Sequence, residues 1–152
     1  MGRPTDPLSE LIIGACIEVH RCLGPGLLES MYEECLVREL TLRGVNTRRQ
    51  IPVPIIYKGM ELEASFRLDV VVEERIVVEV KAVERMLPVH VAQVMTYLRL
   101  TPFSVGLLVN FNVPQLIQGL RRVTRHPNLS PTSHLLLKGS STEITTDGYE
   151  YE

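Results

Sequence analysis

The sequence lacks the features that mark membrane, secreted and disulfide-bonded proteins. No apolar run approaches the roughly 18 residues that a membrane-spanning helix needs, and the N-terminal MGRPTDP contains no apolar signal-peptide segment. The three cysteines, Cys16, Cys22 and Cys35, form no CxxC pair, and their odd number argues against a disulfide framework. We therefore expect a cytoplasmic protein in a reducing compartment.

A strong excess of basic residues is also absent. The formal net charge is −2, which argues against a strongly basic nucleic-acid-binding protein. The bases nevertheless gather in two short segments, RGVNTRR and RRVTR, which carry enough charge to contact phosphates. The candidate nucleic-acid-binding residues are Arg48, Arg49, Arg121 and Arg122, and a merely solvated surface is the alternative for each.

The length and composition that remain fit one globular domain. The chain has 152 residues, of which 45% are hydrophobic and 22% are charged. After His126 the composition turns to Ser, Thr, Pro and Asn, which do not supply a packed core. We expect a single domain over residues 1–126 and a poorly ordered C-terminal tail over residues 127–152.

The spacing of apolar residues predicts the order of the helices and strands. A helical period covers residues 7–23 and 27–43, and it returns at 88–100 and 113–123. Alternation or a short apolar run predicts strands over 47–59, 60–74, 75–83 and 104–111. The predicted fold is α/β, a mixed central β-sheet flanked by α-helices in the order ααβββαβα.

Two charged residues interrupt the Val-rich segment RIVVEVKAV, which spans residues 75–83. Glu79 and Lys81 share one face of this strand because side chains alternate along it. If the hairpin turn centres on Glu74, Asp69 lies opposite Glu79 with the side chains roughly 5 Å apart, whereas a one-residue slip would put Asp69 on the opposite face. Two carboxylates at that distance repel each other and favour a bound cation.

A divalent metal ion satisfies this requirement. Mg²⁺ typically binds one or two carboxylates and completes its shell with water and substrate phosphate. Lys81 then supplies a positive charge beside the metal for a phosphate oxygen or an attacking water. The alternative is a structural ion pair between Glu79 and Lys81 on a half-exposed strand, since a short ExK motif also occurs by chance.

Four ordered motifs resemble one known family. DVVVEERIVVEVKAV resembles the D…ExK half of the PD-(D/E)XK nuclease superfamily, although Leu68 stands where the motif has proline. HRCLGPGLLESMYEECL resembles the GxxExxY family of that superfamily, whose name describes Gly26, Glu29 and Tyr32 here. HVAQVMTYL and GLLVNF resemble the continuation of that family. The resemblance covers about residues 8–125 and implies a restriction-endonuclease-like core for the domain.

The resemblance also implies roles for individual residues. The implied metal ligands are Asp69, Glu79 and the backbone carbonyl of Val80, with Glu29 as a further candidate and Mg²⁺ or, alternatively, Mn²⁺ as the ion. The implied catalytic set is Glu29, Asp69, Glu79, Lys81 and Gln93, supported by Tyr32 and Tyr97. Taken without the family, Glu29 reads as a helix-start acid, Gln93 as a surface amide and the two tyrosines as core residues.

The implied function is metal-dependent hydrolysis of phosphodiester bonds in nucleic acid, with DNA the favoured substrate. The alternative is a non-catalytic module that binds nucleic acid or a protein partner and retains the nuclease fold. The near-neutral charge keeps this alternative open, because a nuclease acting alone usually carries a clearer basic track. No membrane partner is expected, and a homodimer is a candidate assembly.

Overall fold

A computed structural model describes residues 6–125 and 149–151, and it describes the side chains of residues 6–62 and 66–125. Its elements form one mixed sheet with helices on both faces. The strands lie in the order β1-β2-β3-β4-β5-β6; β3 and β4 pair in parallel and the other neighbours are antiparallel. The elements are α1 (Pro7–Leu23), α2 (Glu29–Leu42), β1 (Thr47–Tyr57), β2 (Met60–Val72), β3 (Ile76–Lys81), α3 (Pro88–Leu100), β4 (Val105–Asn110), the 3-10 helix η1 (Leu116–Gly119), β5 (Leu120–Arg125) and β6 (Tyr149–Tyr151). The predicted α/β class is confirmed.

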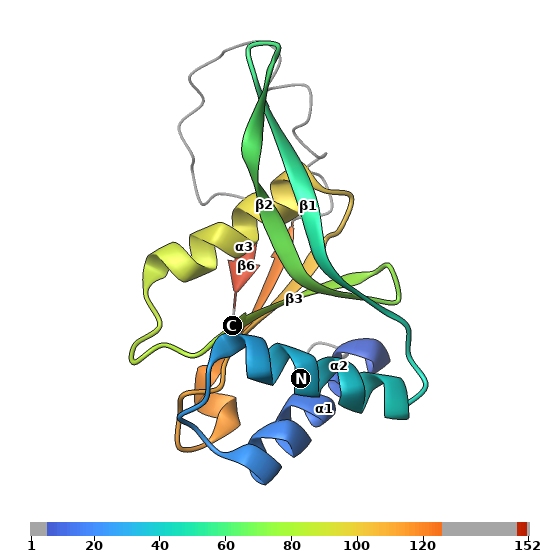
Figure 1. Ribbon diagram of the computed structural model, residues 1–152, viewed down its shortest axis with the longest axis vertical. Helices are drawn as coiled ribbons and strands as arrows, with labels where there is room; N and C mark the ends of the chain where they lie inside the picture. The colour runs from blue at the N-terminus through green and yellow to red at the C-terminus, as the bar shows by residue number, and fades with distance from the viewer. Residues whose placement is uncertain (1–5, 126–148, 152) are drawn as a thin grey trace.

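The two faces of the sheet carry separate cores. Helices α1 and α2 cover one face, and α3 covers the other (Figure 1). Along β3, Val78 and Val80 pack under α1 and α2, whereas Val77 packs under α3. This alternation matches the face assignment predicted from the sequence and places Glu79 on the α3 side.

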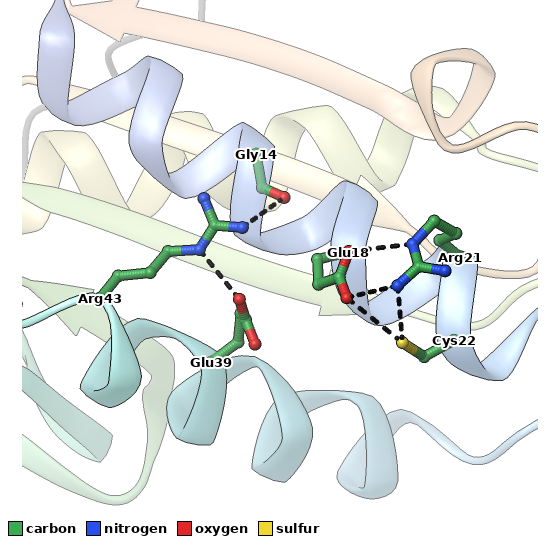
Figure 2. Close-up of polar contacts among 6 residues, drawn as sticks. All are labelled: Gly14, Glu18, Arg21, Cys22, Glu39 and Arg43. Carbon is green, nitrogen blue, oxygen red and sulfur yellow. Dashed lines mark hydrogen bonds and ion pairs between the residues drawn. The ribbon is translucent and has the colours of Figure 1, made fainter.

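Helix α1 begins at a capped turn and packs against α2. Asp6 is its N-cap and accepts a hydrogen bond from the Leu8 N–H at 3.3 Å. At the end of α2, the Arg43 guanidinium donates to Glu39 Oε1 at 3.0 Å and to the Gly14 carbonyl of α1 at 3.4 Å (Figure 2). These contacts tie together the two helices that cover one face of the sheet.

Strand β1 is an edge strand, as its prolines predict. It forms a long hairpin with β2 that extends beyond the body of the domain (Figure 1). The pairing shifts between Val53 and Ile55, where Pro54 has no N–H to donate.

No helix within residues 6–125 has the length and apolar character needed to cross a membrane.

The last predicted helix, over residues 113–123, is wrong. That segment forms the single 3-10 turn η1 and then strand β5, which pairs with the outer edge of β4. A Cβ on Gly119 would lie 2.1 Å from the Asn110 carbonyl oxygen, so this close approach requires glycine, a poor helix former. As a strand, the segment can form backbone hydrogen bonds with the edge of β4, which a helix could not do because its backbone groups bond within the helix.

The predicted tail, residues 127–152, lies largely outside the described residues. Residues 149–151 are described and form β6, which pairs with β5 in antiparallel register. This strand was not predicted from the sequence.

Candidate active site

The carboxylates of Asp69 and Glu79 lie where β2 and β3 separate. The last ladder pair between these strands is Val70 with Val78, which confirms the predicted register up to the site. One residue beyond this pair, Asp69 Oδ2 accepts a hydrogen bond from the Val80 N–H at 2.9 Å. Asp69 is therefore attached to the strand that carries Glu79.

Glu79 is a buried carboxylate with an unfavourable environment for its charge. Its residue is 4% exposed, and burial, followed by the charge of Asp69, raises the pKa of Glu79 to about 8. Burial also raises the pKa of Asp69, and the charge of Glu33 adds to this effect. Glu79 Oε2 has no hydrogen-bond partner among the described residues. Two adjacent carboxylates and an unpaired buried oxygen fit the oxygen donor set of a hard divalent cation.

Lys81 lies beside this pair. Its Nζ is 3.6 Å from Glu79 Oε1, and its side chain is 15% exposed. Its carbonyl accepts a hydrogen bond from the Phe111 N–H at 2.9 Å, which fixes the end of β3 against the residue after β4. The predicted ion pair is present, but one ammonium does not compensate two carboxylates.

Asn110 holds the chain after β3, a role that the sequence analysis missed. Its Nδ2 donates to the Val83 carbonyl at 2.9 Å, and its Oδ1 accepts from the Val83 N–H at 3.0 Å. Oδ1 also accepts the N–H of Asn112 at 3.1 Å. Asn110 is 2% exposed. The signal in the sequence was a single amide at the end of an apolar strand, because a buried amide must form hydrogen bonds with neighbouring backbone groups.

Helix α3 places Gln93 and Tyr97 on the Glu79 side of the sheet. Burial, then the charges of Glu79 and Asp69, raise the pKa of Tyr97, so its hydroxyl lies within electrostatic reach of both carboxylates. Gln93 precedes Tyr97 by one helical turn and faces the same way. Its Oε1 is buried and, like Glu79 Oε2, has no hydrogen-bond partner in the described part of the chain.

Glu29 lies at the end of β3 rather than beside the carboxylate pair. It is the first residue of α2, it is exposed, and its Oε1 accepts the N–H of Ala82 at 3.3 Å. Among the side chains that the structure describes, in residues 6–62 and 66–125, no group of three or more His, Cys, Asp or Glu is arranged to hold a metal ion. The structure thus joins Asp69 and Glu79 but does not gather Glu29 with them as a third ligand.

Tyr32 supports the loop that precedes Glu29. Its hydroxyl donates to the Gly24 carbonyl at 2.5 Å and accepts the Leu27 N–H at 3.1 Å. Its ring stacks on Phe111, with centroids 4.6 Å apart. The residue is fully buried, and its hydroxyl holds the backbone that leads into α2.

Glu33 and Gln50 are two residues near Asp69 that the sequence analysis did not single out. The Gln50 Nε2 donates to Glu33 Oε1 at 2.8 Å and to Asp69 Oδ1 at 3.3 Å. Glu33 is 6% exposed although it carries a carboxylate. The available signal was its position directly after Tyr32, on the side of α2 that turns toward the sheet.

The predicted arginines fall on two separate strands. On β1, Arg48 pairs with Glu74 and Arg49 Nη2 lies 3.5 Å from Glu33 Oε2. On β5, Arg121 donates to the Leu120 carbonyl at 2.8 Å, and Arg122 is half-buried. Strands β2, β3 and β4 separate these pairs in the sheet, so only Arg49 contacts a residue linked to Asp69.

One family model matches most of the described part of the chain. The model of the PD-(D/E)XK nuclease superfamily matches residues 6–123, from the start of α1 into β5. No curated protein and no solved structure matches the chain. The match spans every element that carries a predicted site residue, and nucleases of this superfamily generally use divalent metal ions. The chain therefore belongs to the PD-(D/E)XK nuclease superfamily.

Proposed function

We propose that this protein is a Mg²⁺-dependent nuclease, with Mn²⁺ as an alternative ion, that hydrolyses phosphodiester bonds of DNA. Membership of the superfamily implies a nuclease-like function and nucleic acid as the ligand. The observation that carries the proposal is the pairing of the half-buried Asp69 with the buried Glu79, two adjacent carboxylates that repel each other and have Lys81 beside them.

Three groups would hold the ion. The carboxylates of Asp69 and Glu79 are hard oxygen donors, and the carbonyl of Val80 is the third candidate. One or two carboxylates are sufficient for Mg²⁺, because water and substrate phosphate complete its shell. When bound, the ion would lower the pKa of a water molecule and place a positive charge beside the phosphate.

The remaining residues act on the reacting groups directly. The ammonium of Lys81 stabilises negative charge that develops on the phosphate oxygens, since it is already in place and largely removed from water. The unpaired Oε1 of Gln93 is an acceptor that orients a water molecule. Glu29 orients water or a second ion from the end of β3, and Arg49 supplies charge for the nucleic-acid backbone.

One observation supports a second candidate, a non-catalytic module that binds nucleic acid or a protein partner. In the described residues, Glu29 is not gathered with Asp69 and Glu79, so the chain itself provides only two carboxylates for one ion. A site with two carboxylates depends on water and substrate phosphate for much of the shell. If the shell around the ion were not completed, the domain would still fold and would bind nucleic acid or a protein partner without cleaving a phosphodiester bond.

Incubation of the purified protein with labelled single- and double-stranded DNA and RNA, in Mg²⁺, Mn²⁺ or EDTA, distinguishes the two candidates. We expect cleavage of DNA in either metal and none in EDTA. Asp69→Asn should abolish cleavage, whereas Glu74→Gln, which also neutralises a carboxylate on the same hairpin, should not. Full activity in Asp69→Asn would contradict the assignment. A salt-sensitive gel shift without cleavage would select the binding module.

A further inference from the structure

Gln50 has a backbone conformation that is rare for its residue type. Its φ is 51°, in the left-handed region, although it lies inside strand β1 and is not glycine. The β1–β2 ladder pairs Arg49 with Val70 and Ile51 with Leu68, but no pair joins Gln50 to Asp69 between them. Such strained residues persist where the surrounding structure fixes them, and they cluster at functional sites.

Two hydrogen bonds of the Gln50 side chain hold the residue in this backbone conformation. Its amide lies between two carboxylates, with Nε2 2.8 Å from Glu33 Oε1 and 3.3 Å from Asp69 Oδ1. Both partners accept hydrogen bonds, so the amide nitrogen, with its two hydrogens, must face them. The amide thus separates two like charges and donates to each.

Glu33 is itself held from a second side. Arg49 Nη2 lies 3.5 Å from Glu33 Oε2, while Glu33 Oε1 receives the Gln50 amide. On the far side of the amide, the second oxygen of Asp69 accepts the Val80 N–H at 2.9 Å. A continuous polar chain therefore runs from α2 through β1 and β2 to β3.

We propose that Gln50, held by Glu33, is a positioning residue that fixes the Asp69 carboxylate for a divalent metal ion. This inference rests on the proposed function, because it concerns the same metal site. Without the amide, the Val80 N–H is the hydrogen-bond donor that the described residues still offer Asp69, and the carboxylate can turn about that bond. Residues that orient a metal ligand typically contribute a factor of about 10–100 in metal affinity or activity.

Glycine at position 50 separates the role of the amide from that of the backbone. Gln50→Gly removes the side chain and retains a residue that adopts positive φ without strain. Lys58→Gly is the matched control, since Lys58 also has positive φ, 46°, and lies at the tip of the hairpin. Mn²⁺ binding by calorimetry is the first readout, with kcat, KM and thermal unfolding of the metal-free protein measured in parallel.

We expect Gln50→Gly to remain folded and to bind Mn²⁺ about tenfold or more weakly, because the amide no longer orients Asp69. Its kcat at saturating DNA should fall, with KM for DNA little changed, and Lys58→Gly should match the wild type. Glu33→Ala should reproduce the loss of Mn²⁺ affinity, and the double variant should lose little more, because the two residues act in one chain. Glu33→Gln keeps an acceptor for the amide and should recover part of the affinity.

The outcomes separate this inference from the proposed function. Wild-type Mn²⁺ affinity in both Gln50→Gly and Glu33→Ala, with binding lost in Asp69→Asn, would overturn the positioning role and leave the metal site intact. Additive losses in the double variant would also overturn it. No Mn²⁺ binding by the wild type would overturn the proposed function and this inference together.

Discussion

The ammonium of Lys81 lies 3.6 Å from Glu79 Oε1, whereas Glu79 Oε2 has no hydrogen-bond partner among the described residues. One oxygen of the carboxylate is thus engaged by the chain, and the other is left for a ligand. A purely structural ion pair, buried to this degree, normally satisfies both oxygens. This difference between the two oxygens of Glu79 favours a ligand-binding role for the carboxylate over a purely structural ion pair with Lys81.

Lys81→Met should separate metal binding from catalysis. We expect kcat to fall by about 10²-fold or more, because the charge that develops on the phosphate loses its fixed partner. Mn²⁺ affinity should stay equal or increase, since a competing positive charge leaves Glu79. Calorimetry and cleavage rates measure the two effects, and Lys58→Met, at the exposed hairpin tip, is the control. A parallel loss of Mn²⁺ binding would instead assign Lys81 to the integrity of the site.

The metal-free protein should become less stable as the pH rises toward 8. Burial and Asp69 raise the folded-state pKa of Glu79 to about 8, against an ordinary value of 4.5. Between these values the folded chain holds a proton that the unfolded chain has lost, so rising pH favours unfolding. The total effect is on the order of a few kcal/mol in the free energy of unfolding. Chemical denaturation at several pH values in EDTA measures it.

Glu79→Gln tests the origin of this pH dependence. A neutral amide has no proton to lose, so the variant should show a flatter pH profile and greater stability than the wild type at pH 9. Glu74→Gln, which alters an exposed carboxylate, should keep the wild-type slope. An unchanged slope in Glu79→Gln would attribute the effect to other groups.

Gly119→Ala should destabilise the fold by about 1–3 kcal/mol, as overpacking typically does. Its Cβ would lie 2.1 Å from the Asn110 carbonyl oxygen, a main-chain atom that cannot move aside cheaply. Gly14→Ala is the matched control: its nearest contact, Arg43 Nη1 at 3.1 Å, is the end of a flexible side chain. Thermal unfolding compares the two, and equal stability of the variants would contradict the close contact.

Tyr32→Phe should cost about 1–2 kcal/mol, because two hydrogen bonds in the Gly24–Leu27 turn are lost while the stack on Phe111 remains. Tyr57→Phe removes a hydroxyl from an exposed tyrosine and should be neutral. Denaturant titration measures both. A neutral Tyr32→Phe would mean that water replaces the hydroxyl in the turn.

Local patterns predicted the parts of the fold that depend on neighbouring residues. The register of β2 with β3 followed from a short turn and a period of two, and it brought Asp69 to Glu79. The α1 stripe, with Ile12 and Cys16 buried, followed from helical spacing in the same way. In both cases the pattern and the packing surface are set within one or two adjacent elements.

Contacts between distant elements decided the parts that the sequence did not predict. The left-handed Gln50 and the buried Glu33 depend on how α2 meets β1, which no local pattern contains. Met31 in α2 and Val89 in α3 are apolar residues of helices that cover the sheet, yet they are 47% and 55% exposed. Apolar spacing gives a stripe, and the neighbouring layer determines which part of it is covered.

The separate origins of the site residues also bear on how the chain folds. Asp69 and Glu79 belong to one hairpin, and we expect this local hairpin to form while its carboxylates are still in water. We expect α2, which brings Glu33, and α3, which brings Tyr97, to desolvate these charges when they dock on the sheet. The repulsion therefore opposes the final docking of the helices rather than the pairing of the strands. A divalent ion that relieves it would act as a late assembly factor, slowing unfolding more than it accelerates the first steps of folding.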